Sequence, residues 1–326
     1  MTLDPNLETM LQAMVTYNMM GLSRGGVEKA RRGFRAVTAD ARPPNLVIPV
    51  ASTADGEYPA AEGPLRYRVY RPDLEGPLPT VLFLHGGGWV IGDLDTHDNQ
   101  ARRICAEVGA VVVSAEYRLA PEHPFPAGVE DAWAALRWVW TTIAGFGGDP
   151  SRLAVAGDSA GATLATVAAR RARDAARAGA PDAPRVAAQF LIYPGTDFAA
   201  EVTDYPSRTE NGSDRLLTLE DIVWFAEQYV GPRGASGDLD LADPDLSPLR
   251  TPDLAGLAPA IVVVAEYDPL RDEGVAYAEA LEKAGTPTTL LRMPGMIHGF
   301  FDLGPVSPAV EAAVVESCAV LKNRLS

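Results

Sequence analysis

Cysteine is scarce in this sequence, which has two in 326 residues, Cys105 and Cys318. Two cysteines in apolar helical surroundings offer no disulfide framework and no metal-ligand spacing. We therefore expect reduced thiols in the core and no bound metal. Histidine is also rare, and the four that are present leave few candidates for a catalytic base.

Positive charge is in deficit as well. The chain has 28 Lys and Arg against 43 Asp and Glu, a net charge of -15. A nucleic-acid partner needs a basic face and an anionic membrane surface attracts one, so both are disfavoured. No apolar run is long enough for a membrane span, and the first residues lack the basic and apolar segments of a signal peptide. We expect no membrane insertion, and a cytoplasmic location is the default.

The rest of the composition is that of an ordinary globular protein. Apolar residues make up 47% of the chain and charged residues 22%, and this length suits one large α/β domain. Apolar runs of strand length alternate with helical patterns, which predicts a mostly parallel central sheet with helices on both faces. The expected strands lie at residues 45–49 (within a Pro- and Gly-rich loop at 43–64), 65–70, 80–84, 110–115, 153–156, 187–193, 260–265 and 288–292.

Two segments interrupt this alternation. Near the N-terminus, helical spacing covers about residues 5–20 and 26–37, with no strand pattern. Residues 195–256 are rich in Asp, Pro, Gly and Ser and contain one amphipathic helix at 219–229. Long insertions of this kind are usually functional or disordered. We interpret both segments as parts of a cap over a pocket.

A glycine–serine motif lies between a predicted strand and a predicted helix. Residues 155–161 are Val-Ala-Gly-Asp-Ser-Ala-Gly. In this context Gly-x-Ser-x-Gly forms a nucleophile elbow, a sharp turn that lifts the serine out of the backbone path. Side chains at Gly157 and Gly161 would collide with the neighbouring strand and helix. The motif alone is also compatible with an ordinary tight turn, so Ser159 needs support from other residues.

A serine hydroxyl needs a base, because it is a poor nucleophile at neutral pH. His298 follows a predicted strand near the C-terminus, which fits the order Ser, then Asp or Glu, then His. The other histidines have structural explanations: His85 orients a glycine turn, His97 begins a helix, and His123 lies in a proline-rich loop. We therefore favour His298 as the base.

The base needs a carboxylate that fixes its tautomer and stabilises the imidazolium. Asp268 lies just past the carboxyl end of the strand predicted at 260–265, where ligands of open α/β sheets bind. Asp272 is explained as the N-cap of the next helix, and Glu266 as part of the strand. Asp268 is therefore our choice among the three.

Backbone donors for an oxyanion are expected in residues 85–88, His-Gly-Gly-Gly, which follow the strand at 80–84. Glycines let backbone N–H groups approach a substrate closely. A plain glycine-rich turn would not predict the matching serine elbow downstream. We expect Gly87, Gly88 and Ala160 to donate, and losing one such donor typically costs about 3–4 kcal/mol of transition-state stabilisation.

Together these motifs resemble the hormone-sensitive-lipase-like family of α/β-hydrolases, in its bacterial carboxylesterase branch. The resemblance runs from about residue 65 to the C-terminus. The matching pieces are residues 85–89 (His-Gly-Gly-Gly-Trp), 117–123 (Tyr-Arg-Leu-Ala-Pro-Glu-His), 157–161 (Gly-Asp-Ser-Ala-Gly), 268–274 (Asp-Pro-Leu-Arg-Asp-Glu-Gly) and 298–300 (His-Gly-Phe).

The resemblance implies an α/β-hydrolase fold with a helical cap. It divides the chain into an N-terminal part of the cap at 1–45, a first part of the core at 46–194, an inserted second part of the cap at 195–256 and a second part of the core at 257–326. It also implies no cofactor, a small-molecule ester substrate with a preference for short acyl chains, and a homodimer. The functional groups that it implies are the triad Ser159, Asp268 and His298 and the oxyanion-hole N–H groups of Gly87, Gly88 and Ala160.

The predicted activity is a two-step acyl transfer on short- to medium-chain esters through an acyl-enzyme. We expect Trp89, Asp158, Met14 and Phe225 to line the substrate pocket. Two alternatives stay open. One is an amidase, lactonase or deacetylase that uses the same triad. The other is a non-catalytic ligand-binding protein on a hydrolase scaffold, which would be expected to lose a triad member.

Overall fold

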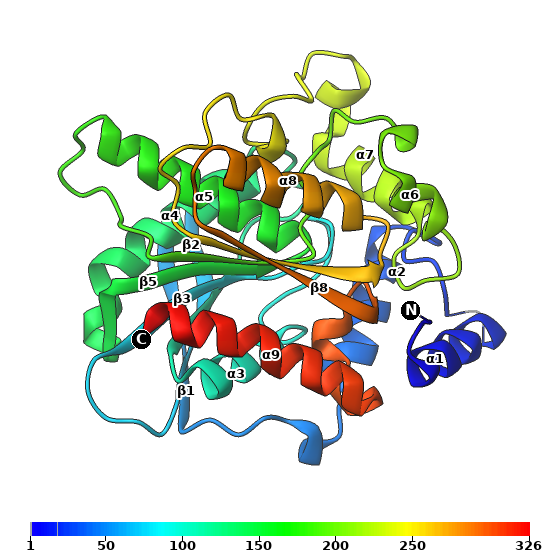
Figure 1. Ribbon diagram of the computed structural model, residues 1–326, viewed down its shortest axis with the longest axis horizontal. Coiled ribbons are helices and arrows are strands. Elements are labelled where there is room, and N and C mark those ends of the chain that lie inside the picture. Colours follow the sequence, from blue (N-terminus) through cyan, green and yellow to red (C-terminus); the bar gives the residue numbers. More distant parts are fainter. Residues whose placement is uncertain (1, 18) are drawn as a thin grey trace.

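The computed structural model describes residues 2–17 and 19–326. One eight-stranded sheet crosses the molecule in the order β1-β2-β4-β3-β5-β6-β7-β8 (Figure 1). β2 is antiparallel to both of its neighbours, and the strands from β4 to β8 are parallel to one another. The strands are β1 (Ser52–Ala60), β2 (Gly63–Arg71), β3 (Leu78–Leu84), β4 (Val111–Ala115), β5 (Gly148–Asp158), β6 (Ala188–Ile192), β7 (Ala260–Tyr267) and β8 (Thr288–Ile297).

Helices cover both faces of the sheet, as the sequence predicts. α4, α5 and α8 pack on one face, and α3 and α9 pack on the other (Figure 1). The helices are α1 (Pro5–Thr16), α2 (Val27–Arg35), α3 (Asp98–Val108), α4 (Ala127–Thr142), α5 (Ala160–Arg177), α6 (Pro206–Glu210), α7 (Leu219–Ala235), α8 (Arg271–Lys283) and α9 (Pro308–Leu325). Within the described residues, none of them is long and apolar enough to cross a membrane.

The continuous apolar run of β3 follows from this layering. Successive side chains of a strand point to opposite faces. Leu82 and Leu84 lie in the core cluster under α4 and α5, whereas Val81 and Phe83 lie in the cluster under α3 and α9. Both cysteines are buried and free, in agreement with the expected core thiols.

The N-terminal half of the sheet differs from the sequence prediction. Residues 45–49 form no strand: a 3-10 helix covers Pro44–Leu46, because Pro43 and Pro44 fix the local backbone torsions. The first strand is instead β1, which lies within the segment predicted as loop. β1 is an edge strand with a mostly exposed burial pattern, so it lacks the apolar run that marks the inner strands.

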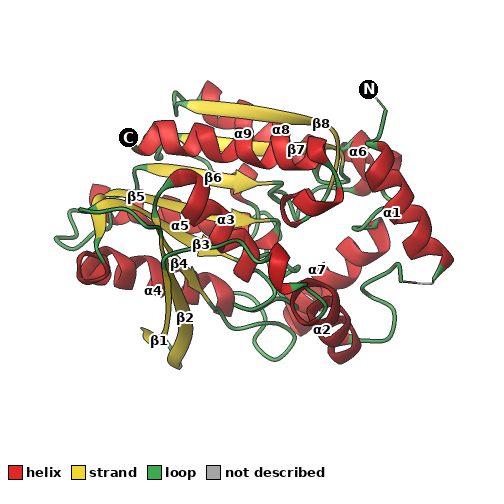
Figure 2. Cartoon of the chain, turned by 90° about the horizontal axis from the view of Figure 1, so that it is seen from below, coloured by secondary structure: helices red, strands yellow, loops and turns green. Residues whose placement is uncertain are grey.

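Four helices lie together beyond the carboxyl ends of the parallel strands: α1, α2, α6 and α7 (Figure 2). We refer to them as the cap helices. α1 and α2 precede the first strand, and α6 and α7 lie between β6 and β7. α7 continues past its predicted end to Ala235 through a kink at Gly231, whose φ is 59°.

Candidate active site

The residues predicted to carry the chemistry each follow directly on the end of a strand. His85 follows β3, Ser159 follows β5, Asp268 follows β7 and His298 follows β8. Because these strands are parallel, their carboxyl ends meet at the same edge of the sheet. We call the 85–88 loop together with Ser159, Asp268 and His298 the strand-end residues.

Ser159 occupies the sharp turn between β5 and α5. Its backbone has φ 52° and ψ -123°, a conformation that is rare for a residue with a side chain. A Cβ atom on Gly157 would collide with the backbone of Gly161, and one on Gly161 would collide with the carbonyl oxygen of Leu84. The two glycines therefore let strand, turn and helix approach closely, as the motif predicts.

Three distant side chains meet at this turn. His298 Nε2 lies 3.0 Å from Ser159 Oγ, and His298 Nδ1 lies 2.8 Å from Asp268 Oδ2. Since a carboxylate only accepts, Nδ1–H is the donor to Asp268, which leaves the Nε2 lone pair for the serine hydroxyl proton. This arrangement can withdraw a proton from Ser159 and stabilise the imidazolium that results.

The loop after β7 holds the buried carboxylate of Asp268. Asp268 is fully buried, and its Oδ1 accepts the N–H of Leu270 at 2.8 Å. The N-cap position of α8 belongs to Leu270, so the prediction of Asp272 as N-cap is wrong. Asp272 lies in the first helical turn and accepts the N–H of Ser207, which ties α6 to this loop.

The expected oxyanion donors lie beside Ser159. Gly87 and Gly88 have φ of 113° and 58°, which favour glycine. Within residues 2–17 and 19–326, the N–H groups of Gly87, Gly88 and Ala160 donate to no backbone or side-chain acceptor. All three residues line the same cavity as Ser159. Unused N–H groups at a helix N-terminus and a glycine loop suit a developing oxyanion.

His85 supports the glycine loop from behind. Its Nδ1 lies 2.7 Å from the carbonyl oxygen of Gly86, so Nδ1–H donates to it. The ring stacks on Tyr117 at 4.4 Å, and the Tyr117 hydroxyl donates to the carbonyl oxygen of His85. Burial lowers the pKa of His85 to about 4, so the ring is neutral at pH 7. This geometry agrees with a role in orienting the loop.

Asp158 lies at the cavity wall, but its carboxylate has protein partners. Asp158 Oδ1 accepts the N–H of Gly86 at 2.8 Å and lies 3.6 Å from His97 Nε2. The sequence explains His97 only as the start of a helix, and His97 is indeed the N-cap residue of α3. The contact of His97 with Asp158 was not predicted, because it joins two distant parts of the chain and no local sequence pattern indicates that they meet.

A large apolar cavity opens above Ser159. Its volume is about 1370 Å³, and it is lined by strand-end residues and by all four cap helices. Met14, Trp89, Phe225 and Asp158, the residues expected to line a substrate pocket, all lie in its wall. Trp89 stacks on Tyr229 of α7, with ring centres 4.4 Å apart and planes 8° apart. Two aromatic rings thereby join the glycine loop to the cap helices.

Two ion pairs lie in the cavity wall. Arg42 binds Asp302 at 2.5 Å, and Arg208 binds Glu273 at 2.6 Å. Burial raises the pKa of both acids despite the arginines beside them. Sequence patterns gave no sign of either pair, because each arginine belongs to the expected cap and each acid to the core. In the described part of the chain, no group of three His, Cys, Asp or Glu is placed to hold a metal ion.

Comparison with known proteins agrees with this geometry. A family described by the alpha/beta hydrolase fold matches residues 81–302. The carboxylic ester hydrolase LipN of Mycobacterium tuberculosis is 42% identical over 100% of this chain and 84% of its own length. The carboxylesterase NlhH of the same species is 40% identical over 99% of this chain and 96% of its own.

The solved structures include close matches. The hyperthermophilic esterase of the archaeon Pyrobaculum calidifontis superimposes with a TM-score of 0.87 and 39% identity, covering 99% of both chains. Fold, sequence and strand-end geometry thus agree with the resemblance drawn from the motifs. The chain belongs to the α/β-hydrolase fold family, in its hormone-sensitive-lipase-like branch.

Proposed function

We propose that this protein is a serine carboxylesterase with Ser159 as nucleophile, His298 as base and Asp268 as the acid that orients the base. The observation that carries this proposal is the series of contacts from Asp268 through His298 to the Ser159 hydroxyl, at 2.8 and 3.0 Å. The ester-hydrolase names of the two mycobacterial relatives support the same reaction class.

The reaction proceeds in two steps. His298 Nε2 takes the Ser159 proton as Oγ bonds to the ester carbonyl carbon, and the N–H groups of Gly87, Gly88 and Ala160 donate to the oxyanion. The carbon–oxygen bond to the alcohol breaks, and the alcohol leaves with the proton from His298. Water, deprotonated by His298, then attacks the acyl carbon, and the carboxylic acid leaves as Ser159 recovers its proton.

The cavity favours uncharged, apolar esters. Arg42 and Arg208 in its wall are each paired with a carboxylate, so neither arginine is free to bind a substrate carboxylate. Its volume of about 1370 Å³ exceeds the roughly 300–1,000 Å³ of an ordinary small-molecule site. We therefore propose that medium acyl chains are accepted as well as the short ones that the family resemblance implies.

The decisive experiment replaces the nucleophile. Ser159→Ala should lower kcat/KM on a short-chain nitrophenyl ester by at least about 10⁴-fold, since the rest of the site cannot supply a nucleophile. Ser151→Ala, at an exposed serine in β5, is the matched control and should keep full activity. Full activity in Ser159→Ala would refute the assignment.

Matched substrates separate the alternatives. Equal kcat/KM on an ester and on the corresponding amide or lactone would favour amidase or lactonase activity over carboxylesterase activity. Ligand binding without covalent labelling by an organophosphate would favour a non-catalytic protein. In a series of nitrophenyl esters, kcat/KM should rise by up to about fourfold per methylene until the acyl chain fills its part of the cavity.

The remaining expectations stay predictions. We propose that the cap helices cover the pocket, which limited proteolysis with and without a bound phosphonate would test. Sedimentation would test the homodimer, and cell fractionation would test the cytoplasmic location.

A further inference from the structure

We propose that His97 is a positioning residue for the oxyanion hole, acting through the carboxylate of Asp158. This inference depends on the proposed function, because it assigns a purpose to the loop that carries Gly87 and Gly88. His97 lies outside the contact series of the triad, and no step of the proposed reaction uses it.

Asp158 joins the two backbone segments that supply the expected donors. It directly precedes Ser159 and Ala160, and its Oδ1 accepts the N–H of Gly86 at 2.8 Å. The contact is tight, because a Cβ atom on Gly86 would collide with Asp158 Oδ2. A shift of this carboxylate would therefore move Gly86, and with it the two glycines that follow.

The ring of His97 is placed against this carboxylate. Its Nε2 lies 3.6 Å from Asp158 Oδ1, and both side chains are buried. Its Nδ1 lies 2.9 Å from Thr96 Oγ1. The Thr96 hydroxyl also accepts the N–H of Asp93 and donates to its carbonyl oxygen. A hydroxyl has one proton, so in this arrangement Nδ1–H must be the donor to Thr96, and an imidazolium directs Nε2–H at Asp158.

The charges around the pair favour the ionised state of both partners. Burial opposes protonation of His97, but Asp158, then Asp302 and then Asp93 raise its pKa above the ordinary value. Burial also opposes ionisation of Asp158, but His97 and the Gly86 N–H together outweigh burial, so the pKa of that carboxyl is lowered. The neutral ring of His85, 5.2 Å from His97 between ring centres, adds no competing charge at pH 7, and Arg42 is paired with Asp302.

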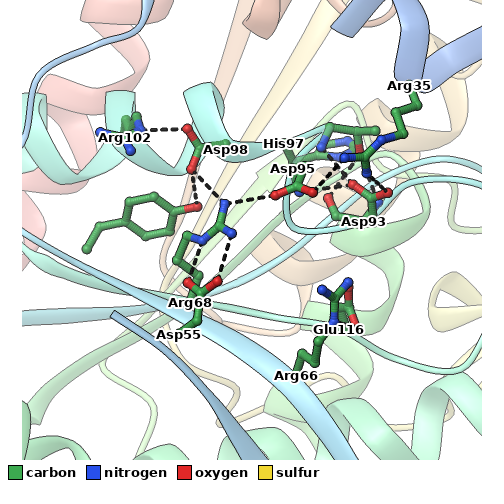
Figure 3. Close-up of polar contacts among 12 residues, drawn as sticks. Arg35, Asp55, Arg66, Arg68, Asp93, Asp95, His97, Asp98, Arg102 and Glu116 are labelled. Carbon is green, nitrogen blue, oxygen red and sulfur yellow. Dashed lines mark hydrogen bonds and ion pairs between the residues drawn. The ribbon is translucent and has the colours of Figure 1, made fainter. Parts of the chain in front are cut away.

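Ion pairs to Arg35 and Arg68 hold the loop that carries His97 (Figure 3). Arg35 of α2 binds Asp93 at 2.9 Å and Asp95 at 2.8 Å. Arg68 of β2 binds Asp95 and Asp98, each at 3.1 Å. The loop of His97 is therefore held from the sheet through Arg68 as well as from α2, as a positioning residue requires.

The test compares His97→Gln with His123→Gln, which removes an exposed histidine outside the site. His97→Gln should lower kcat by about tenfold with KM changed less than threefold, because the transition state depends on the oxyanion donors more than the bound ester does. The Ki of a trifluoromethyl ketone, which mimics the oxyanion, should rise in proportion to the loss in kcat/KM. His123→Gln should match the wild type.

Two further readouts exclude a merely structural effect. Above the raised pKa of His97 the imidazolium loses its proton, so wild-type kcat should fall by about threefold at alkaline pH, and His97→Gln should lack this fall. Asp158→Asn keeps an acceptor for Gly86 and should retain more kcat than Asp158→Ala. An unchanged kcat and Ki in folded His97→Gln would overturn the proposal, even with Ser159→Ala inactive. An active Ser159→Ala would overturn the proposed function itself.

Discussion

The two sides of the cavity are held in place by different forces. The strand-end residues continue from strands such as β3 and β7, whose central residues are buried in apolar clusters on both faces. The two N-terminal cap helices bury little: α2 has one buried residue, Ala30, and α1 has Leu7 and Leu11. Polar contacts hold α2 instead, because Arg31 binds Glu122 and Arg35 binds Asp93 and Asp95.

This difference separates two requirements of the enzyme. Proton transfer and oxyanion binding need atoms held within tenths of an ångström, which close packing supplies. Admission of varied esters needs a wall that can move, and elements with few buried apolar contacts open at low free-energy cost. Substitutions on the strand-end side should therefore change kcat, whereas those on the cap side should change KM.

After the nucleophile itself, the largest effect is expected at the buried acid. Asp268→Asn should lower kcat by about 10³–10⁴-fold, because an amide can donate to His298 Nδ1 and so favours the wrong tautomer. KM should change little, and circular dichroism would show that the fold is intact. Asp272→Asn, at the acid in the first turn of α8, is the control and should lose less than tenfold. Equal losses of kcat in the two variants would contradict a special role for Asp268.

A second substitution tests where the two sides meet. Gly88→Ala should lower kcat by about 10²–10³-fold, because its Cβ would collide with the Phe225 ring of α7 and displace a donor. The double variant Gly88→Ala, Phe225→Ala separates the two causes in steady-state kinetics. Recovery of kcat would assign the loss to the cap contact, and no recovery would assign it to the glycine backbone, whose φ is 58°.

The cap side is tested on a single helix. Arg31→Ala removes contacts to Glu122 and to the carbonyl oxygens of Val90 and Ala120, and should raise KM by about fivefold with kcat kept within twofold. Arg32→Ala is the control, since Arg32 is 72% exposed and binds Glu28 of its own helix. A large fall in kcat in Arg31→Ala would show that the cap side also positions the chemistry.

The smallest effect concerns pH and stability. His85 has a pKa of about 4 in the folded chain, below the ordinary 6.5, because burial disfavours its charge. Between pH 4 and 6.5 the unfolded chain therefore binds a proton that the folded chain does not, and the free energy of unfolding rises with pH. Tm should fall between pH 7 and pH 5 by about 2 °C more in the wild type than in His85→Gln. An identical fall in both would contradict this.

Its neighbour His97 should act in the opposite sense. Its pKa is raised in the folded chain, so its stabilising contribution is complete below about 6.5 and is lost as pH rises through the folded value. Burial lowers the pKa of both rings, but Asp158 contacts His97 directly at 3.6 Å and so outweighs burial there and not at His85. The sign of the pH dependence thus distinguishes two buried histidines within one site.

The sequence predicts the strand-end side far better than the cap side. Ser159, Asp268 and His298 follow apolar strands, and parallel strands bring their carboxyl ends together whatever the intervening chain does. β1 escapes prediction because polar residues such as Asp55 and Glu57 lie on an exposed edge strand. Local patterns determine where a strand ends, so they locate residues placed by strand ends.

Contacts between distant polar residues are a different matter. Two examples are the contacts of His97 with Asp158 and of Arg42 with Asp302. From the sequence alone, each of these side chains is explained equally well as a helix cap or as a solvated charge. Their pairing follows from the relative placement of helices and loops, which neither periodicity nor turn signals specify. Helices α1 and α2 raise the same difficulty, since few buried apolar residues fix their positions.

The chain segments that form the cap helices contain no strand of the sheet: α1 and α2 precede β1, and α6 and α7 lie in the connection from β6 to β7. Evolution or a protein engineer can therefore exchange these segments for those of a relative without interrupting a single backbone ladder. Such chimaeras should inherit their hydrolytic machinery from one parent and their choice of ester from the other.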